Sequence, residues 1–144
     1  MKTNETSYFI RSWNDNVVNW TEALLNYNTS YNSNSLVKSN DNGFFVSHEA
    51  HKIDKVSKVL EDNNFNVAHL YFNIITKTKT FGKHNDTMDV WFWQCQGVTQ
   101  WIINDKETII LNPGDLIYVP SGVYHEVVPL SPRVGISMSR EKLL

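Results

Sequence analysis

The sequence predicts a mainly β protein, a small barrel or sandwich with one or two helices packed on its outside. From residue 66 onward, short runs of apolar and β-branched residues recur between Gly, Pro, Asn and Asp, which is the pattern of consecutive strands and turns. Before residue 66, apolar residues recur at helical spacing in two stretches. With 144 residues, the chain suits one domain and is short for two. We therefore expect a single domain over residues 1–144, with a helix-containing part at 1–65 and the barrel at 66–144.

The part before residue 66 is expected to hold two helices, each preceded by a strand. The expected strands and helices are residues 8–10, 15–25, 43–46 and 48–61. Asn14 or Asp15 would cap the first helix and Ser47 the second, because short polar side chains accept hydrogen bonds from the first helical N–H groups. The segment 26–43 is rich in Asn and Ser and has little to bury, so we expect an exposed loop, broken at most by a short strand at 36–37.

After residue 66, the expected elements are strands joined by turns. They are residues 67–75, 84–94, 99–103, 107–111, 116–119, 126–128 and 134–139. Asn104 and Asp105 suit a hairpin turn between the third and fourth of these strands. Pro113 and Gly114 predict a further turn, because Pro presets φ and Gly tolerates the positive φ that follows.

Three residues form a candidate metal site. His84 and Asp86 are two residues apart, a spacing that puts both on the same face of a strand. His125 lies between a turn that contains Pro120 and Gly122 and the strand expected at 126–128, so its direction is fixed. Two His and one carboxylate form a ligand set of iron that leaves three octahedral positions open. Taken singly, each residue more often makes a local hydrogen bond, but the joint pattern favours a divalent metal. Zinc or nickel would compete for these ligands in a purified sample.

Four residues stand at the spacing of the second cupin motif: Gly114, Pro120, Gly122 and His125. The segment 82–92, which contains His84 and Asp86, resembles the first metal-binding strand of JmjC-type and ribosomal-protein oxygenases. The resemblance covers residues 82–140 and implies a double-stranded β-helix, the cupin or jelly-roll barrel. It also implies that His84, Asp86 and His125 bind Fe(II), with 2-oxoglutarate as cosubstrate. Many other cupins have a second His where Asp86 stands, so the resemblance favours the oxygenase branch.

The resemblance leaves the binding of the far carboxylate of 2-oxoglutarate open. In the oxygenase families a Lys or Arg fills this role, and the corresponding position is Thr99, which has no charge. Thr99 can donate only one neutral hydrogen bond, so if 2-oxoglutarate is the cosubstrate, a cation must come from elsewhere. Arg133 is the first choice, because a guanidinium pairs with a carboxylate through two hydrogen bonds. Lys77 and Lys79 are the alternatives.

Strand parity predicts the wall of the cavity beside the metal. Counted from Asp86, the inward residues are Phe92 and Gln94, and Trp101 joins them if Thr99 faces inward. Trp91 and Trp93 would pack on the opposite face. Asp89 falls off the metal face, and we expect it to hold a loop.

Composition limits the partners. The net charge is −2 without a block of Lys or Arg, which argues against a dedicated surface for nucleic acid or anionic membranes. No apolar run approaches the roughly 20 residues of a membrane span, and the N-terminus has no apolar core of a signal peptide. Cys95 is the single cysteine, so no internal disulfide is expected and a reducing, cytoplasmic location is the default.

The resemblance implies an Fe(II)- and 2-oxoglutarate-dependent oxygenase that hydroxylates a small molecule or a peptide side chain. Two alternatives stay open: a non-enzymatic cupin that binds a metal or small ligand, and a dioxygenase that works without 2-oxoglutarate. The chain ends soon after the last expected strand. We therefore expect it to lack the additional C-terminal domain of ribosomal-protein oxygenases, and we infer no ribosomal substrate.

Overall fold

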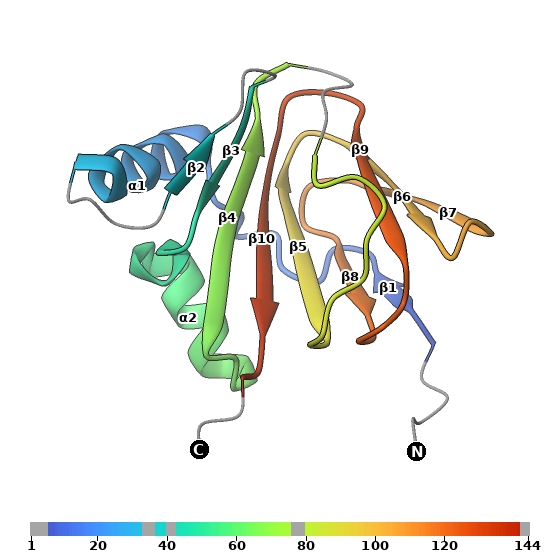
Figure 1. The fold of residues 1–144 in the computed structure, drawn as a ribbon. Coiled ribbons are helices and arrows are strands. Elements are labelled where there is room, and N and C mark those ends of the chain that lie inside the picture. The colour runs from blue at the N-terminus through green and yellow to red at the C-terminus, as the bar shows by residue number, and fades with distance from the viewer. Residues whose placement is uncertain (1–5, 33–36, 40–42, 76–79, 142–144) are drawn as a thin grey trace.

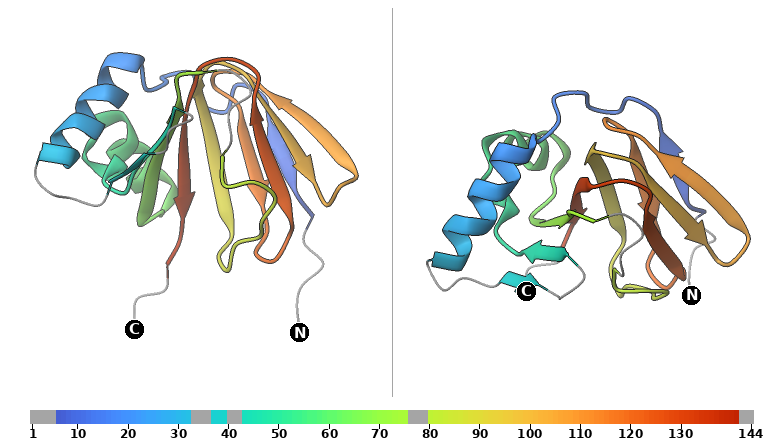
Figure 2. Two further views of the ribbon diagram at one scale, coloured as in Figure 1. Left: turned by 45° about the horizontal axis from the view of Figure 1, so that its top comes forward. Right: turned by 90° about the horizontal axis from the view of Figure 1, so that it is seen from above.

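Two antiparallel β-sheets face each other in the computed structural model, which describes residues 6–32, 37–39, 43–75 and 80–141. Two helices pack against the outer face of the larger sheet (Figure 1, Figure 2). The larger sheet has seven strands in the order β1-β8-β5-β10-β4-β3-β2, and the smaller has three in the order β7-β6-β9. This is the two-sheet layout expected of a jelly-roll barrel.

Short strands make up both sheets. The strands of the larger sheet are β1 (Tyr8–Ile10), β2 (Val37–Ser39), β3 (Phe44–Ser47), β4 (Val67–Asn73), β5 (Val90–Gln96), β8 (Leu116–Val119) and β10 (Arg133–Ser139). Those of the smaller sheet are β6 (Thr99–Ile103), β7 (Glu107–Leu111) and β9 (His125–Pro129). The helices are α1 (Trp20–Asn32), α2 (Asp54–Asn63) and the 3-10 helix η1 (Ala50–Lys52). Among the described residues, no helix has the length and apolar content of a membrane span.

Helix α1 begins and ends later than the sequence predicted. Asn19 caps it: Asn19 Oδ1 accepts the Glu22 N–H at 2.8 Å, and Glu22 Oε1 accepts the Asn19 N–H at 3.0 Å, the reciprocal bonds of a capping box. The helix then continues into the segment predicted to be an exposed loop. For residues 26–32 that prediction was wrong, because a polar side chain can be buried where it finds a partner, as Asn26 does by donating to the Glu49 carbonyl.

The second predicted helix is two elements. Ser47 ends β3 instead of capping a helix, and η1 separates it from α2, which begins at Asp54. Three apolar side chains of α2 are buried: Val56, Val59 and Leu60. Asn64 follows in the left-handed conformation, with φ of 57°, and ends the helix.

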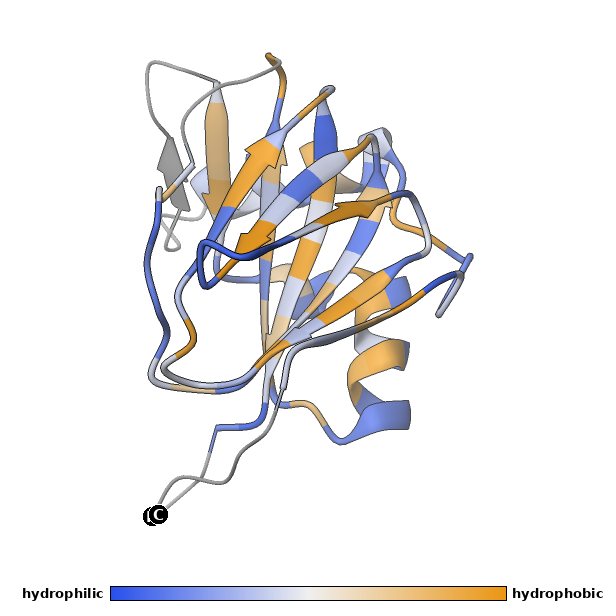
Figure 3. Ribbon diagram, turned by 90° about the vertical axis from the view of Figure 1, so that its right-hand side faces the viewer, coloured by the Kyte–Doolittle hydropathy of each residue, from blue (hydrophilic) through white to orange (hydrophobic). Residues whose placement is uncertain are grey.

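Two hydrophobic clusters divide the interior. One lies between the helices and the larger sheet and includes Leu70 and Trp93. The other lies between the two sheets and includes Phe92 and Trp101. Hydrophobic and hydrophilic residues alternate along several strands (Figure 3), because neighbouring side chains leave opposite faces of a sheet. The second cluster borders the cavity that contains the candidate site.

Candidate metal centre

His84, Asp86 and His125 converge on one cavity. Their ligand atoms all lie within 4.8 Å of one another. Asp86 Oδ2 is 3.3 Å from His125 Nε2, and Asp86 Oδ1 is 3.8 Å from His84 Nε2. The His125 side chain is 4% exposed, whereas those of His84 and Asp86 are 31% and 36% exposed. The cluster is therefore anchored on one side and accessible on the other.

Backbone hydrogen bonds bring the two motifs together. The sequence predicted that His84 and Asp86 lie on one continuous strand, but β5 begins only at Val90. His84 instead forms an isolated antiparallel bridge with His125, with N–H to carbonyl distances of 2.9 and 2.8 Å. The Gly122 N–H donates to the Asp86 carbonyl at 2.8 Å. These bonds link the turn before His125 to the segment that carries the other two ligands.

Each histidine ring is oriented by its own backbone partner. His84 Nδ1 lies 2.8 Å from the Gly82 carbonyl, and His125 Nδ1 lies 3.0 Å from the Val123 carbonyl. Because a carbonyl only accepts, Nδ1 carries the proton and Nε2 presents its lone pair to the cluster. Burial lowers the pKa of His125, and the neighbouring His84 lowers it further, although the bond to Val123 acts in the opposite direction. The neutral form that binds metals is thereby favoured.

Two further residues hold His125 in place. The Trp101 ring lies nearly parallel to the His125 ring, with centroids 5.7 Å apart and an interplanar angle of 17°. Asp89 Oδ1 accepts the Ser121 N–H at 2.8 Å, which fixes the turn before His125. The hydrogen bond confirms the expectation that Asp89 holds a loop.

The cavity beside the cluster has a volume of about 380 Å³. Aromatic side chains form much of its wall: Phe44, Tyr71, Phe81, Phe92 and Trp101. Gly135 makes room for one of them, because a Cβ at this position would lie 2.1 Å from Phe92 Cζ. Trp93 packs on the opposite face of β5, among the side chains between the helices and the larger sheet.

Arg133, the first residue of β10, is a buried cation on the cavity wall, only 1% exposed. Its Nε donates to Asn73 Oδ1 at 2.7 Å, and the guanidinium carbon lies 5.7 Å from the ring centroids of Phe44 and Phe92. Its Nη1 has no hydrogen-bond partner among the described residues. Burial lowers the pKa of Arg133 to about 10, which leaves the guanidinium charged at neutral pH. A buried charge with an unpartnered N–H is costly, so this site favours an anionic ligand.

Tyr71 interacts with both charged groups of the cavity. Burial raises the pKa of Tyr71 to about 12, and the Asp86 carboxylate adds to the rise. A hydrogen bond with Ser137 and the charge of Arg133 act in the opposite direction. The phenol therefore stays protonated at neutral pH.

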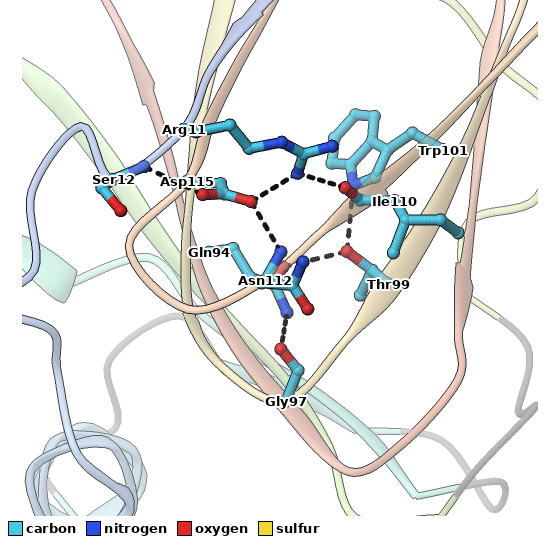
Figure 4. A network of polar contacts seen from close by, with 9 residues as sticks. All are labelled: Arg11, Ser12, Gln94, Gly97, Thr99, Trp101, Ile110, Asn112 and Asp115. Atoms are coloured by element: carbon cyan, nitrogen blue, oxygen red, sulfur yellow. Dashed lines mark hydrogen bonds and ion pairs between the residues drawn. The ribbon is translucent and has the colours of Figure 1, made fainter.

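Thr99 and Gln94 belong to a buried hydrogen-bond chain (Figure 4) and do not line the cavity. Thr99 Oγ1 donates to Gln94 Oε1 at 3.0 Å and accepts from Trp101 Nε1 at 3.2 Å. Gln94 Nε2 donates to the carbonyls of Gln96 and Gly97 at 3.0 and 2.9 Å. These bonds use the polar atoms of both side chains. The expectation that Gln94 lines the cavity is wrong. The expectation that Thr99 binds the cosubstrate stays a prediction, and the bonds of Thr99 Oγ1 to Gln94 and Trp101 do not support it.

The other sequence-based candidates divide between the cavity and the rest of the chain. The structure places Phe92, Trp101 and Arg133 on the cavity wall, whereas Lys77 and Lys79 lie outside the described residues. Sequence reasoning missed Tyr71 and Phe44. Alternation along β4 is the signal that could have found Tyr71, because it shares a face with His69. No local pattern marks Phe44.

No protein-family model and no curated protein sequence matches this chain. Several solved structures are similar to it in fold. The Escherichia coli ribosomal oxygenase YcfD in complex with cobalt and 2-oxoglutarate gives a TM-score of 0.75 at 13% identity, over 97% of this chain and 49% of that chain. YcfD with cobalt and succinic acid gives 0.60 at 20% identity, over 69% and 32%. A cupin superfamily protein from Desulfitobacterium hafniense gives 0.53 at 13% identity, over 73% and 84%.

These similarities confirm the predicted fold. The chain has the fold of these proteins, the cupin double-stranded β-helix, built from two antiparallel sheets with two helices. It spans between about a third and a half of the length of the ribosomal oxygenase.

Proposed function

We propose that this protein is an Fe(II)- and 2-oxoglutarate-dependent oxygenase that hydroxylates a C–H bond of a small molecule or a peptide side chain. One observation carries the proposal: one cavity joins a His-Asp-His cluster to a buried arginine whose Nη1 has no hydrogen-bond partner in the described ranges of the chain. A divalent metal bound by Asp86 leaves one positive charge, and Arg133 adds a second. A dianion such as 2-oxoglutarate neutralises both.

The residues present fit these two ligands. His84, Asp86 and His125 would hold Fe(II) and leave three octahedral positions for other ligands. Arg133 would bind the far carboxylate, with Nη1 as one of its donors. When bound, Fe(II) and 2-oxoglutarate would activate O₂. One oxygen atom oxidises the oxoacid to succinate and CO₂, and the other enters the substrate.

The chain itself would orient these groups and exclude water. Phe92 and Trp101 form an apolar wall beside the cluster, and the Trp101 ring also fixes His125. Arg133 lies on β10, in the larger sheet. It would supply the positive charge that the oxygenase families have at the position of Thr99 on β6. The ribosomal oxygenase that shares this fold is in complex with cobalt and 2-oxoglutarate, which supports a divalent metal and 2-oxoglutarate as the ligands here.

Calorimetry of 2-oxoglutarate binding to anaerobic, Fe(II)-loaded protein tests the proposal. We expect one cosubstrate per chain, and succinate after admission of air. Metal-free protein is the control, and its affinity should be at least about tenfold lower because the chelate is lost. If protein that holds iron does not bind 2-oxoglutarate at millimolar concentration, the proposal fails. A binding cupin, or a dioxygenase that works without an oxoacid, would then be favoured.

A further inference from the structure

Aromatic side chains of the cavity wall form a closed circuit with the two histidines of the metal cluster. Each ring contacts the next, with centroids between 4.4 and 6.1 Å apart. In order, the rings are those of His84, His125, Trp101, Phe92, Tyr71 and Phe81, and Phe81 contacts His84 again. We call these residues the ring circuit. A group held against the circuit would lie beside the metal cluster.

Phe81 is the exposed member of the ring circuit. It is 51% exposed, whereas Phe92 and Trp101 are each 2% exposed. The Phe81 ring lies nearly perpendicular to the rings of Tyr71 and His84, with interplanar angles of 77° and 76°. About half of this ring is therefore left for contact with a molecule that enters the cavity from solvent.

The residues on either side of Phe81 hold it in position. Thr80 Oγ1 donates to the Val127 carbonyl at 2.9 Å, which ties the chain before Phe81 to β9. The Gly82 carbonyl lies 2.8 Å from His84 Nδ1, which ties the chain after Phe81 to the metal cluster. A side chain that is positioned before the ligand arrives loses less conformational freedom on binding.

The charges of the wall indicate what kind of molecule contacts Phe81. Apart from the histidine rings, Asp86 and Arg133 carry the charges among the described residues that line the cavity. The proposed metal uses the first and the proposed cosubstrate the second. A further ion would lose its water without gaining a counter-charge, and a cation would also be repelled by the metal. An uncharged aromatic ring instead gains by leaving water and packs favourably against other rings.

We propose that Phe81 is a specificity-determining residue, and that its exposed half packs against an uncharged aromatic group of the primary substrate. The inference rests on the proposed oxygenase activity in naming this molecule the substrate. The packing itself depends on the ring circuit and on the charges of the described wall. A quaternary ammonium group, which aromatic rings also bind, is the competing occupant.

Three probes that share a benzene ring test the proposal: neutral benzyl alcohol, cationic benzyltrimethylammonium and anionic benzenesulfonate. Each is titrated into Zn(II)-loaded protein that is saturated with 2-oxoglutarate and labelled with ¹³C in its Phe rings. We expect benzyl alcohol to shift the Phe81 signal and to bind at least about tenfold more tightly than either ion. If either ion bound as tightly as benzyl alcohol, the proposal would be overturned.

Variants separate Phe81 from the rest of the surface. Phe81→Leu keeps an apolar side chain but removes the ring, so it should weaken benzyl alcohol binding about fivefold and leave the affinity for 2-oxoglutarate unchanged. Phe81→Tyr keeps the ring and should bind benzyl alcohol as the wild type does. Tyr124→Leu is the matched control, because Tyr124 is 49% exposed and adjoins His125 in sequence but does not line the cavity.

Two results with these variants would overturn the proposal: unchanged affinity for benzyl alcohol in Phe81→Leu, or an equal loss in Tyr124→Leu. If 2-oxoglutarate fails to bind, the titration of benzyl alcohol without it still compares Phe81→Leu with the wild type. Failure of the proposed function and failure of this inference are therefore distinguishable.

Discussion

Arg133 lies opposite Asn73 in the register of β10 and β4 and donates Nε to Asn73 Oδ1 at 2.7 Å, while Nη1 has no hydrogen-bond partner within the described part of the chain. The pairing fixes the guanidinium against the cavity wall without neutralising its charge. A buried charge in this state destabilises the ligand-free fold. Removal of the Arg133 charge should therefore lower the affinity for an anion and raise the stability of the ligand-free protein.

Arg133→Met tests this opposition. We expect the affinity for 2-oxoglutarate to fall about 100-fold, or roughly 3 kcal/mol, because the far carboxylate loses its cation. The free energy of unfolding of the ligand-free protein should rise by about 1 kcal/mol, since the relief of a buried charge exceeds the lost hydrogen bond. Calorimetry and urea denaturation measure the two effects on the same samples.

Arg140→Met is the control for Arg133. Arg140 stacks over Phe65 and Trp91 and does not line the cavity, so its removal should not change the affinity for 2-oxoglutarate. A loss of both stability and affinity in Arg133→Met would instead indicate that Arg133 only supports the fold.

A second prediction compares how strongly metal affinity depends on the three proposed ligands and on the nearby Asp89. His84→Ala, Asp86→Ala and His125→Ala should each lower metal affinity by more than about 100-fold, since even residues that only orient metal ligands reach that range. Asp89→Ala should lower it far less, because Asp89 acts through the Ser121 N–H. Metal content after dialysis measures the effect. Undiminished metal in all three ligand variants would exclude the site.

Thr99→Val tests the role of the buried hydrogen-bond chain. The substitution keeps the shape of the side chain but leaves Gln94 Oε1 and Trp101 Nε1 without their bonds to Thr99 Oγ1. We expect a loss of about 1–3 kcal/mol in the free energy of unfolding, with the affinity for 2-oxoglutarate unchanged. If affinity fell while stability did not, Thr99 would have to be reassigned to the cosubstrate.

These residues indicate which parts of the site the sequence could predict. His125 could be placed because a turn with Pro120 and Gly122 precedes it and restricts its direction. His84 and Asp86 were identified from their chemistry, although they lie before β5 and not on it. Their position depends on backbone bonds to residues about 40 positions away, such as His84 to His125, which no local pattern encodes.

Strand parity predicted the direction of side chains but not their hydrogen-bond partners. It tells which face a side chain leaves, so the wall positions of Phe92 and Trp101 agree with it. It does not tell whether a neighbour uses the polar atoms, as Thr99 and Gln94 use one another's. Polar composition misled in the same way at Asn26, which is buried in α1 because it binds the Glu49 carbonyl.

A last prediction concerns Asp115, which ties the N-terminal segment to the turn before β8 (Figure 4). Its carboxylate accepts from Arg11 Nη1 at 2.6 Å and from the N–H groups of Ser12 and Asn112 at 3.0 and 2.9 Å. Burial acts to raise the pKa of Asp115, but these hydrogen bonds and the charge of Arg11 outweigh it, so the pKa lies below its ordinary value.

An acid whose pKa is lowered by folding stabilises the protein above its unfolded pKa, and the effect is lost as pH falls through the folded pKa. Asp115→Asn should therefore cost about 2 kcal/mol at neutral pH, and the gap to the wild type should shrink below about pH 4, where the unfolded carboxyl takes up its proton. Urea denaturation across this pH range measures the gap. Asp105→Asn, at an exposed ion pair with Lys83, should change little at any pH. An equal gap at acidic and neutral pH would mean that the shape of Asp115, and not its charge, holds the N-terminal segment.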